Sequence, residues 1–255
     1  MGNTNKPQNI GCRQCLEGQE LEFDFSMAFQ PIVDVSTKTV FAQEALVRGM
    51  GDKPAADVFT HVNDANMYAF DQACRIKAIE LASRLNITSL LSINFMPNAV
   101  YRPELCIRAT LAAAEEFKFP VSQIMFEVTE SEKIGDVPHL QSIINHYQKQ
   151  GFTTALDDFG AGHSGLNTLA DLEVDVLKID MYLARDIQTN KRKHAIVSGI
   201  VATCQELDMK IIAEGVETRD EFKALQDLGI DLFQGFYFAR PSYETLPEVM
   251  WDNIR

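Results

Sequence analysis

Short apolar runs alternate with longer amphipathic stretches along most of the chain. Met67, Phe70, Cys74 and Ala78 recur at steps of three and four, the spacing of one face of an amphipathic helix. The expected strands are residues 25–33, 39–47, 90–95, 124–128, 153–156, 176–179 and 210–213, with a last strand near Leu232. The expected helices span residues 67–85, 104–117, 139–149, 194–207 and 219–228.

This alternation predicts an α/β fold in which parallel strands are joined by right-handed crossovers. About eight such units in 255 residues favour a (β/α)8 TIM-like barrel over an open sheet. The first two runs are separated by only DVSTK, which predicts a hairpin, so we expect an irregular and partly antiparallel first strand pair. Residues 1–20 are polar and aperiodic and are expected to be an N-terminal tail, with residues 21–255 forming a single barrel domain.

Charge and composition exclude some classes of partner. The net charge of −13 argues against binding of duplex nucleic acid, which requires a basic face, although bound cations would still admit an anionic ligand. The N-terminal residues show no secretory signal and no apolar run is long enough to span a bilayer, so we expect no membrane association and a cytoplasmic location.

The tail contains Cys12 and Cys15, a CxxC pair that is half of a zinc site without a second half at zinc spacing. Reduced thiols are the favoured interpretation, and zinc binding or redox sensing stay open.

Polar residues end nearly every expected strand. Residues 153–165 are an apolar run that ends in adjacent carboxylates, Asp157 and Asp158, and continues into glycines. The strand-end residues are Glu44, Asn94, Glu127 with Glu130, Asp157 with Asp158, Lys178 with Asp180, Glu214 with Glu217, and Gln234. Helix capping explains any one of these acids but not the series.

The carboxyl ends of barrel strands meet at one rim, so we expect these residues to converge. Oxygen ligands without paired histidines or thiols favour Mg²⁺ or Mn²⁺. Adjacent aspartates suit two metals about 4 Å apart that share a carboxylate. The residues alone leave a two-metal hydrolase and a metal-assisted lyase open.

The same segments resemble the motifs of a known family. They read QPIVD (30–34), EALVRG (44–49), SINFMP (92–97), FEVTE (126–130), LDDFGAGHSGL (156–166), LKID (177–180), AEGVET (213–218) and QGFYFARP (234–241). In this order they resemble the EAL-domain family of bacterial cyclic di-GMP phosphodiesterases. The resemblance implies hydrolysis of cyclic di-GMP to linear pGpG by two-metal activation of water, with two Mg²⁺ or Mn²⁺ ions per site, and it implies a homodimer.

The resemblance also implies roles for individual residues. The implied ligands of one metal are Glu44, Asn94, Glu127 and Asp157, and those of the second are Asp157 and Asp158 with Glu214 as a further candidate. The implied catalytic residues are Lys178, Glu214 and Asp158, and the choice of Lys178 or Glu214 as general base stays open. The implied substrate-binding residues are Gln30, Leu46, Arg48 and Gln234. Glu130 is implied to anchor the glycine-rich loop, and Glu217 is an additional candidate.

A non-catalytic cyclic di-GMP receptor of the same fold is the alternative function. Because every implied metal ligand and Lys178 are present, we favour the enzyme. Phe236 and Phe238 are interpreted as barrel packing rather than as a platform for base stacking.

Overall fold

The computed structural model describes residues 21–97, 100, 102–129, 137–161 and 166–254. Cys12, Cys15 and Glu130 lie outside the described residues. Within the described part of the chain, no helix has both the length and the apolar character needed to cross a membrane.

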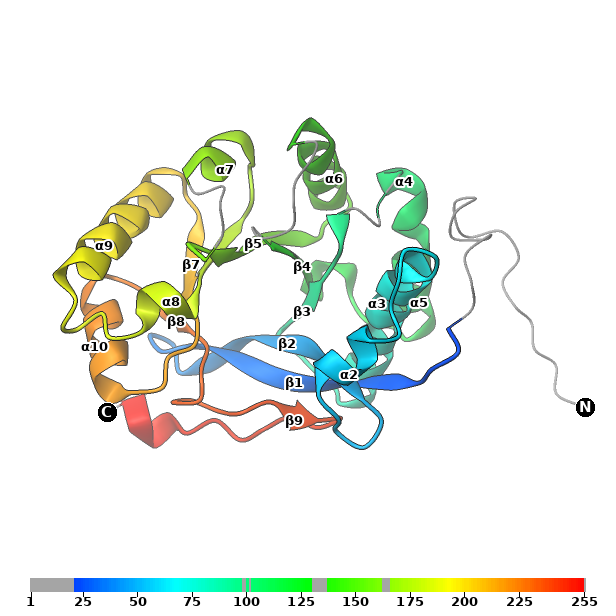
Figure 1. Ribbon diagram of the computed structural model, residues 1–255, viewed down its shortest axis with the longest axis horizontal. Helices are drawn as coiled ribbons and strands as arrows, with labels where there is room; N and C mark the ends of the chain where they lie inside the picture. The colour runs from blue at the N-terminus through cyan, green and yellow to red at the C-terminus, as the bar shows by residue number, and fades with distance from the viewer. Residues whose placement is uncertain (1–20, 98–99, 101, 130–136, 162–165, 255) are drawn as a thin grey trace, which may run out of the picture.

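Eight strands close into a barrel, which confirms the predicted fold class (Figure 1). They are β1 (Phe25–Asp34), β2 (Thr39–Gly49), β3 (Leu90–Asn94), β4 (Ile124–Thr129), β5 (Thr153–Phe159), β6 (Val176–Ile179), β7 (Lys210–Ala213) and β8 (Leu232–Phe233). Neighbours from β2 to β8 are parallel, whereas β1 is antiparallel to both β2 and β8. The expected irregular first pair is therefore present, and it is the element that closes the barrel. A short β9 (Ser242–Tyr243) pairs with β1.

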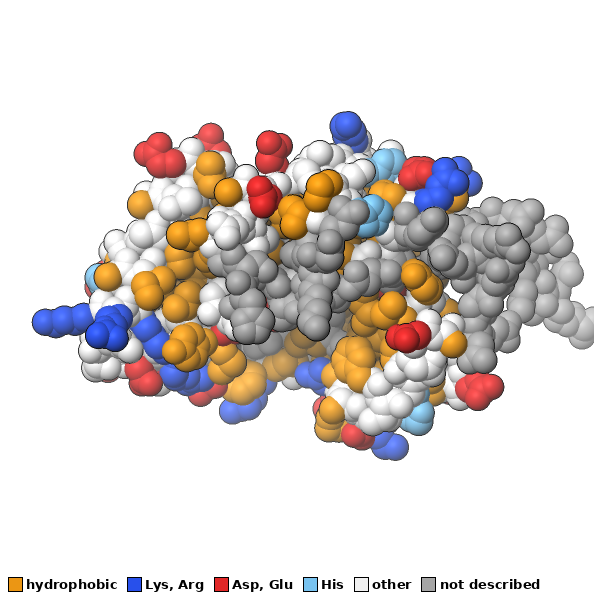
Figure 2. Space-filling view, turned by 45° about the horizontal axis from the view of Figure 1, so that its top comes forward, with side chains coloured by type: hydrophobic (Ala, Val, Ile, Leu, Met, Phe, Trp, Pro, Cys, Tyr) orange, Lys and Arg blue, Asp and Glu red, His pale blue; other side chains and the backbone are white. Residues whose placement is uncertain are grey.

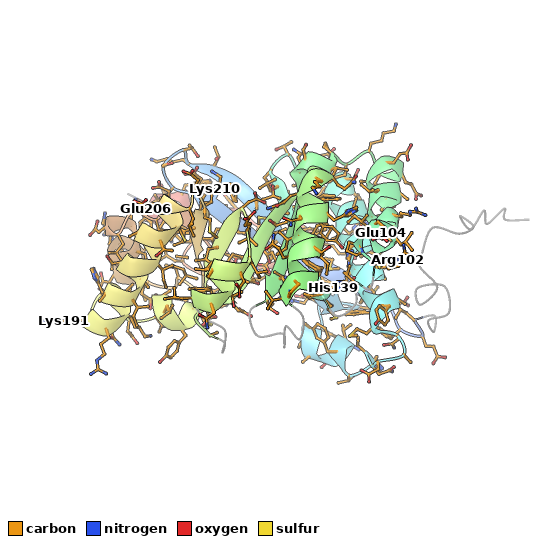
Figure 3. All side chains as sticks on the ribbon, turned by 90° about the horizontal axis from the view of Figure 1, so that it is seen from above. Arg102, Glu104, His139, Lys191, Glu206 and Lys210 are labelled. Carbon is orange, nitrogen blue, oxygen red and sulfur yellow. The ribbon has the colours of Figure 1, made fainter. Side chains whose placement is uncertain are left out.

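Helices cover most of the outside of the barrel, while β9 and the C-terminal segment lie beside β1 (Figure 1). The helices are α2 (Ala55–Phe59), α3 (Met67–Arg84), α4 (Pro103–Cys106), α5 (Arg108–Glu116), α6 (Val137–Lys149), α7 (Leu166–Asp171), α8 (Met181–Ala184), α9 (Lys191–Glu206) and α10 (Arg219–Asp227), with 3₁₀ turns at Val121–Gln123 and Trp251–Ile254. The helix expected at 104–117 is divided at Ile107 into α4 and α5. Lys191 and Glu206 mark the ends of α9 in Figure 3. That helix starts before His194 because the Asn190 side chain caps it, accepting bonds from the amides of Arg192 and Lys193.

Charged groups of both signs are distributed over the described part of the face in Figure 2. On the face in Figure 2, Lys and Arg side chains form small separate groups with acidic side chains between them. Together with the net charge of −13, the described side chains on that face form no continuous basic stripe for a nucleic-acid backbone.

A buried ion pair joins α3 to the barrel wall. Asp71 and Arg75 form a salt bridge with both side chains almost fully buried, and Asp71 Oδ1 accepts the Met96 amide at 2.9 Å. The Arg75 guanidinium lies 5.5 Å from the Phe126 ring centroid and donates to the Tyr147 hydroxyl at 3.3 Å. This pair therefore packs between α3 and the outer side of β3 and β4, next to Met96 and Phe126.

We predict that Arg75→Met lowers the free energy of unfolding by about 3–5 kcal/mol, because it leaves Asp71 buried without its counter-charge. Burial already raises the pKa of Asp71 against the lowering effect of Arg75. Urea unfolding measures the loss. The double variant Asp71→Asn/Arg75→Met should recover part of it; a double variant no more stable than Arg75→Met would show that the unpaired charge is not the cause.

Candidate active site

The polar residues of the site lie two positions along their strands from a layer of buried apolar residues. One buried cluster inside the barrel consists of Ile32, Ala42, Met125, Ala155, Val176, Ile212 and Leu232. Residues two apart on a strand point to the same side of the sheet. The residues two positions away are Gln30, Glu44, Glu127, Asp157, Lys178, Glu214 and Gln234. A layer of apolar side chains thus underlies a layer of polar ones. Gln30 precedes its apolar partner, rather than following it, because β1 runs in the opposite direction.

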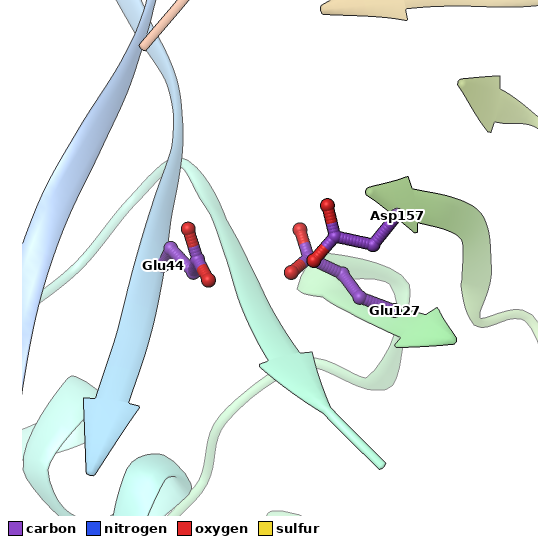
Figure 4. A group of neighbouring side chains, drawn as sticks. All are labelled: Glu44, Glu127 and Asp157. Atoms are coloured by element: carbon purple, nitrogen blue, oxygen red, sulfur yellow. The ribbon is translucent and has the colours of Figure 1, made fainter. Parts of the chain in front are cut away.

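Lys178 lies at the centre of this polar layer. Its side chain is 1% exposed, and its Nζ lies 2.7 Å from Glu214 Oε1, 2.9 Å from Glu127 Oε2 and 3.1 Å from Asp157 Oδ1. Glu44 Oε2 is slightly further, at 3.7 Å. Figure 4 shows the carboxylates of Glu44, Glu127 and Asp157 turned toward one another from β2, β4 and β5. Four carboxylates thus surround one ammonium group.

Amide and hydroxyl donors orient two of the acids. Glu44 accepts the side-chain amides of Asn94 at 3.1 Å and Gln234 at 2.7 Å, one on each carboxylate oxygen. The Ser92 hydroxyl donates to Glu127 Oε1 at 2.5 Å. These donors fix the two carboxylates before any ligand arrives. Ser92 was not among the residues selected from the sequence, although it lies two positions before Asn94 on the same face of β3.

A break in strand register brings Asp158 to the same cavity as Asp157. Consecutive side chains of a regular strand point to opposite faces. Here the β5–β6 register shifts between Leu156 and Phe159, and Asp158 adopts a left-handed backbone with φ 56°. The Asp158 amide donates to Asp157 Oδ1 at 2.8 Å. As a result both carboxylates line one cavity.

Two groups of acids have the spacing of cation sites. Glu44, Glu127 and Asp157 form one group, and Asp157, Asp158 and Glu214 form the other; in each, one ligand atom per residue lies within 4.8 Å of the others. Asp157 belongs to both. All the donors are oxygens, which suits Mg²⁺ or Mn²⁺. Glu127 Oε2 is buried and accepts no hydrogen bond from the described residues, even with Lys178 Nζ at 2.9 Å. This donor set therefore fits two hard divalent cations sharing Asp157.

Burial and the charges of neighbouring acids raise the pKa values of Glu127 and Asp158. Burial raises the pKa of Glu127 to about 8, with Lys178 opposing the shift and Glu44 and Asp157 adding to it. The pKa of Asp158 rises to about 6 through burial and the neighbouring Asp157 charge. For Lys178, burial disfavours the charged form, but the surrounding acids outweigh burial and hold its pKa well above the usual value. Lys178 is therefore an ammonium ion in this arrangement.

We predict that Mn²⁺ binding strengthens as pH rises from 6 to 8. Carboxylates whose pKa values are raised to about 6 and about 8 hold protons that a cation must displace, so affinity is lowest at the acidic end. Each displaced proton contributes about a tenfold change in affinity per pH unit. Calorimetric titration in buffers of different ionisation enthalpy measures both affinity and proton release. Affinity that stays constant from pH 6 to 8 would contradict this prediction.

Two cavities adjoin the cluster. An acidic one of 320 Å³ is lined by Gln30, Glu44, Asp157, Asp158, Asp180, Met181, Glu214, Gly215, Glu217, Gln234, Gly235 and Phe236. A largely apolar one of 290 Å³ is lined by residues that include Leu46, Arg48, Phe70, Asn94, Phe95 and Met96. Glu44 and Asn94, which are hydrogen-bonded to each other, connect the two. All four residues expected to bind substrate line one cavity or the other.

Phe236 corrects one interpretation from the sequence. Phe238 is fully buried, as expected for barrel packing, but Phe236 is 40% exposed and lines the acidic cavity. Its ring lies 4.1 Å from the Arg240 guanidinium. The packing interpretation was wrong for Phe236. Phe236 and Phe238 are both apolar aromatics that follow β8, and residue type alone does not show which of them is buried and which is exposed.

Two solved structures with similar folds contain cyclic di-GMP. This chain is 49% identical to a standalone EAL protein from Vibrio cholerae O395 in its c-di-GMP bound form, with a TM-score of 0.89 over 92% of this chain and 100% of that one. It is 34% identical to BlrP1 of Klebsiella pneumoniae in a manganese and cyclic di-GMP complex, with a TM-score of 0.84 over 91% of this chain and 60% of that one.

Curated relatives share the domain but are longer. The chain is 30% identical to the blue light- and temperature-regulated antirepressor BluF of Escherichia coli, covering 88% of this chain and 56% of BluF. It is 29% identical to the cyclic di-GMP phosphodiesterase RocR of Pseudomonas aeruginosa, covering 87% of this chain and 58% of RocR. The EAL domain family model matches residues 16–241, and the chain therefore belongs to the EAL domain family.

Proposed function

We propose that this chain is a metal-dependent phosphodiesterase that hydrolyses cyclic di-GMP to linear pGpG. The observation that carries the proposal is the pair of acid groups that share Asp157 beside the buried ammonium of Lys178. Relatives named cyclic di-GMP phosphodiesterases and structures with bound cyclic di-GMP support the choice of substrate.

Two Mg²⁺ or Mn²⁺ ions would be held by Glu44, Asn94, Glu127 and Asp157 on one side and by Asp157, Asp158 and Glu214 on the other. When bound, such a pair acidifies a water and stabilises the attacking and leaving oxygens of an in-line displacement. The cations also offset the charge of the cluster, which would otherwise repel a phosphodiester.

The chain's own groups would orient and deprotonate the water. Lys178 carries a proton, so it donates a hydrogen bond to the attacking oxygen and does not act as the base. Glu214 is the candidate proton acceptor, since its side chain lines the acidic cavity and its carboxylate lies 2.7 Å from Lys178 Nζ. We therefore assign the general base to Glu214, with Asp158 as its neighbour in the second acid group.

The two cavities would hold the two halves of the dinucleotide. Gln30 and Gln234 lie in the acidic cavity, where Phe236 offers an apolar surface to a base. Leu46 and Arg48 line the apolar cavity. Arg48 Nη1 donates to the carbonyl of the adjacent Val47 at 2.8 Å, and Arg48 Nε lies 3.7 Å from Oδ1 of the exposed Asp52. A phosphate oxygen that binds Arg48 would therefore compete only with weak partners.

The alternative is a receptor that binds cyclic di-GMP without cleaving it, and the antirepressor name of BluF motivates it. The decisive experiment incubates the protein with cyclic di-GMP and Mn²⁺ and separates the products by chromatography. We expect pGpG from wild type and none from Asp157→Asn. Nucleotide that is retained intact while calorimetry shows bound Mn²⁺ would establish the receptor instead.

Three further proposals concern the whole chain. We propose that residues 21–255 are a single barrel domain with residues 1–20 as a tail, that the protein acts in the cytoplasm, and that it forms a homodimer. Limited proteolysis tests the domain division, and analytical ultracentrifugation tests the dimer.

A further inference from the structure

Glu221 is a buried acid near the start of α10. Its residue is 2% exposed, although glutamate at a helix N-terminus is ordinarily solvated. It forms a capping box with Thr218, whose hydroxyl accepts the Glu221 amide at 3.3 Å. Glu221 Oε2 in turn accepts the amides of Glu217 and Thr218, each at 3.1 Å. These contacts belong to the connection between β7 and α10, and they stabilise the start of the helix.

The second oxygen of Glu221 reaches a different connection. Oε1 accepts the amide of Asp186 at 3.2 Å and lies 3.8 Å from Arg185 Nη1. Both residues follow α8, in the connection between β6 and α9. One carboxylate thus joins two loops that are more than thirty residues apart in sequence, and helix capping requires only one of its two oxygens.

Arg185 reinforces the same junction. Its guanidinium binds the Glu217 carboxylate through both terminal nitrogens, Nη1 to Oε2 at 3.0 Å and Nη2 to Oε1 at 2.9 Å. Lys193 Nζ holds the other side of α8, donating to the carbonyl of Arg185 at 2.8 Å and to that of Tyr182. The segment from Met181 to Asp186 is therefore held from both α9 and α10.

The two joined loops leave the strands that carry Lys178 and Glu214. They touch where Gly215 packs on Met181: a Cβ at Gly215 would lie 2.3 Å from the Met181 Cβ, and Gly215 has φ 63°. Lys178 Nζ and Glu214 Oε1 are 2.7 Å apart at the base of the same two loops. The contact between the two loops at Gly215 is therefore directly beside Glu214 in the chain.

We propose that Glu221, together with Arg185, is a positioning residue that holds the Glu214 loop against the loop after β6 and so sets the second acid group for its cation. This inference rests on the proposed function, because it takes Glu214 as a ligand or proton acceptor. It adds a role for two residues that lie outside both acid groups.

Two variants separate this role from helix capping. Glu221→Gln keeps one carbonyl oxygen and replaces the other with an NH₂ group, so it can serve only one of the two loops. Thr218→Ala removes the capping hydroxyl and leaves both oxygens of Glu221 in place. If Glu221 only caps α10, the two variants behave alike.

The test measures Mn²⁺ binding by calorimetry and amide hydrogen exchange in the peptide covering residues 181–190. We expect Glu221→Gln to weaken the weaker Mn²⁺ site about tenfold, the low end of the losses that follow removal of supporting contacts around a metal site, and to accelerate exchange in this peptide. Thr218→Ala should match wild type in both measurements. Arg185→Met, at a half-buried position, should change both in the same direction as Glu221→Gln, and it carries the test if that variant does not fold.

Glu221→Gln and Arg185→Met that bind Mn²⁺ and exchange like Thr218→Ala would overturn the inference, as would a wild type that binds no Mn²⁺. Failure of the proposed function is distinct: wild type would bind Mn²⁺ and cyclic di-GMP but release no pGpG, and the binding and exchange measurements would still decide the role of Glu221.

Discussion

Replacing Glu44 by Gln is expected to abolish most hydrolysis of cyclic di-GMP while leaving the barrel folded. Glu44 contributes one carboxylate to the acid group with Glu127 and Asp157, and its two oxygens are held by the amides of Asn94 and Gln234. Gln has the same size but lacks the charge and cannot accept from both amides at once. We expect Mn²⁺ affinity to fall about 10- to 100-fold, with a comparable loss of turnover at limiting metal.

Thermal unfolding with and without Mn²⁺ separates this effect from misfolding. Removing one of several mutually repelling carboxylates should leave the metal-free melting temperature close to that of wild type. The increase on adding Mn²⁺ should shrink, because stabilisation by a ligand follows its affinity for the folded state. Ser26→Ala is a matched control, since Ser26 is buried on the neighbouring β1 but bonds Glu244 outside the site. Unchanged Mn²⁺ affinity in Glu44→Gln would remove Glu44 from the ligands.

The sequence predicted most of the barrel because short, mainly apolar runs mark strands such as β3, β4, β6 and β7, and longer stretches with apolar residues at steps of three and four lie between the strands. It also predicted that the polar residues at the strand ends share a rim, because the carboxyl ends of parallel barrel strands meet there. The structure adds the layer beneath them, with Glu127 above Met125 and Lys178 above Val176. What pattern alone did not provide is the direction of β1 relative to β8, since that pairing joins residues about two hundred positions apart.

Features that depend on a local departure from regular structure were also missed. The sequence placed Asp157 and Asp158 in one site, but it did not locate the register shift in β5 or the left-handed φ at Asp158 that turns both carboxylates to the same cavity. Asp adopts positive φ more readily than most residues, yet this preference does not say which aspartate of the chain will do so. The α8 helix, Met181–Ala184, is too short to show a period. In the sequence, Glu221 has the position of an ordinary capping residue, and its second oxygen acquires a partner only when the loop after α8 lies against the start of α10.

Replacing Lys178 by Met is expected to have the opposite effect on metal binding and a similarly large effect on turnover. The fully buried ammonium is the charge that offsets Glu44, Glu127, Asp157 and Glu214. Its pKa is raised, so this contribution to stability is present throughout neutral pH and is lost only as pH rises through the shifted value. Without it, the metal-free protein should lose about 3–5 kcal/mol of unfolding free energy.

Divalent cations would then face a more negative site with no competing ammonium. We therefore expect Lys178→Met to bind Mn²⁺ more tightly than wild type and to show a larger increase in melting temperature when Mn²⁺ is added. Turnover should still fall about 10²- to 10³-fold, because a hydrogen-bond donor aimed at the reacting oxygen is gone. Metal titration followed by product chromatography measures both. A variant that binds Mn²⁺ more weakly than wild type would mean that Lys178 organises the carboxylates rather than competing with the cations for them.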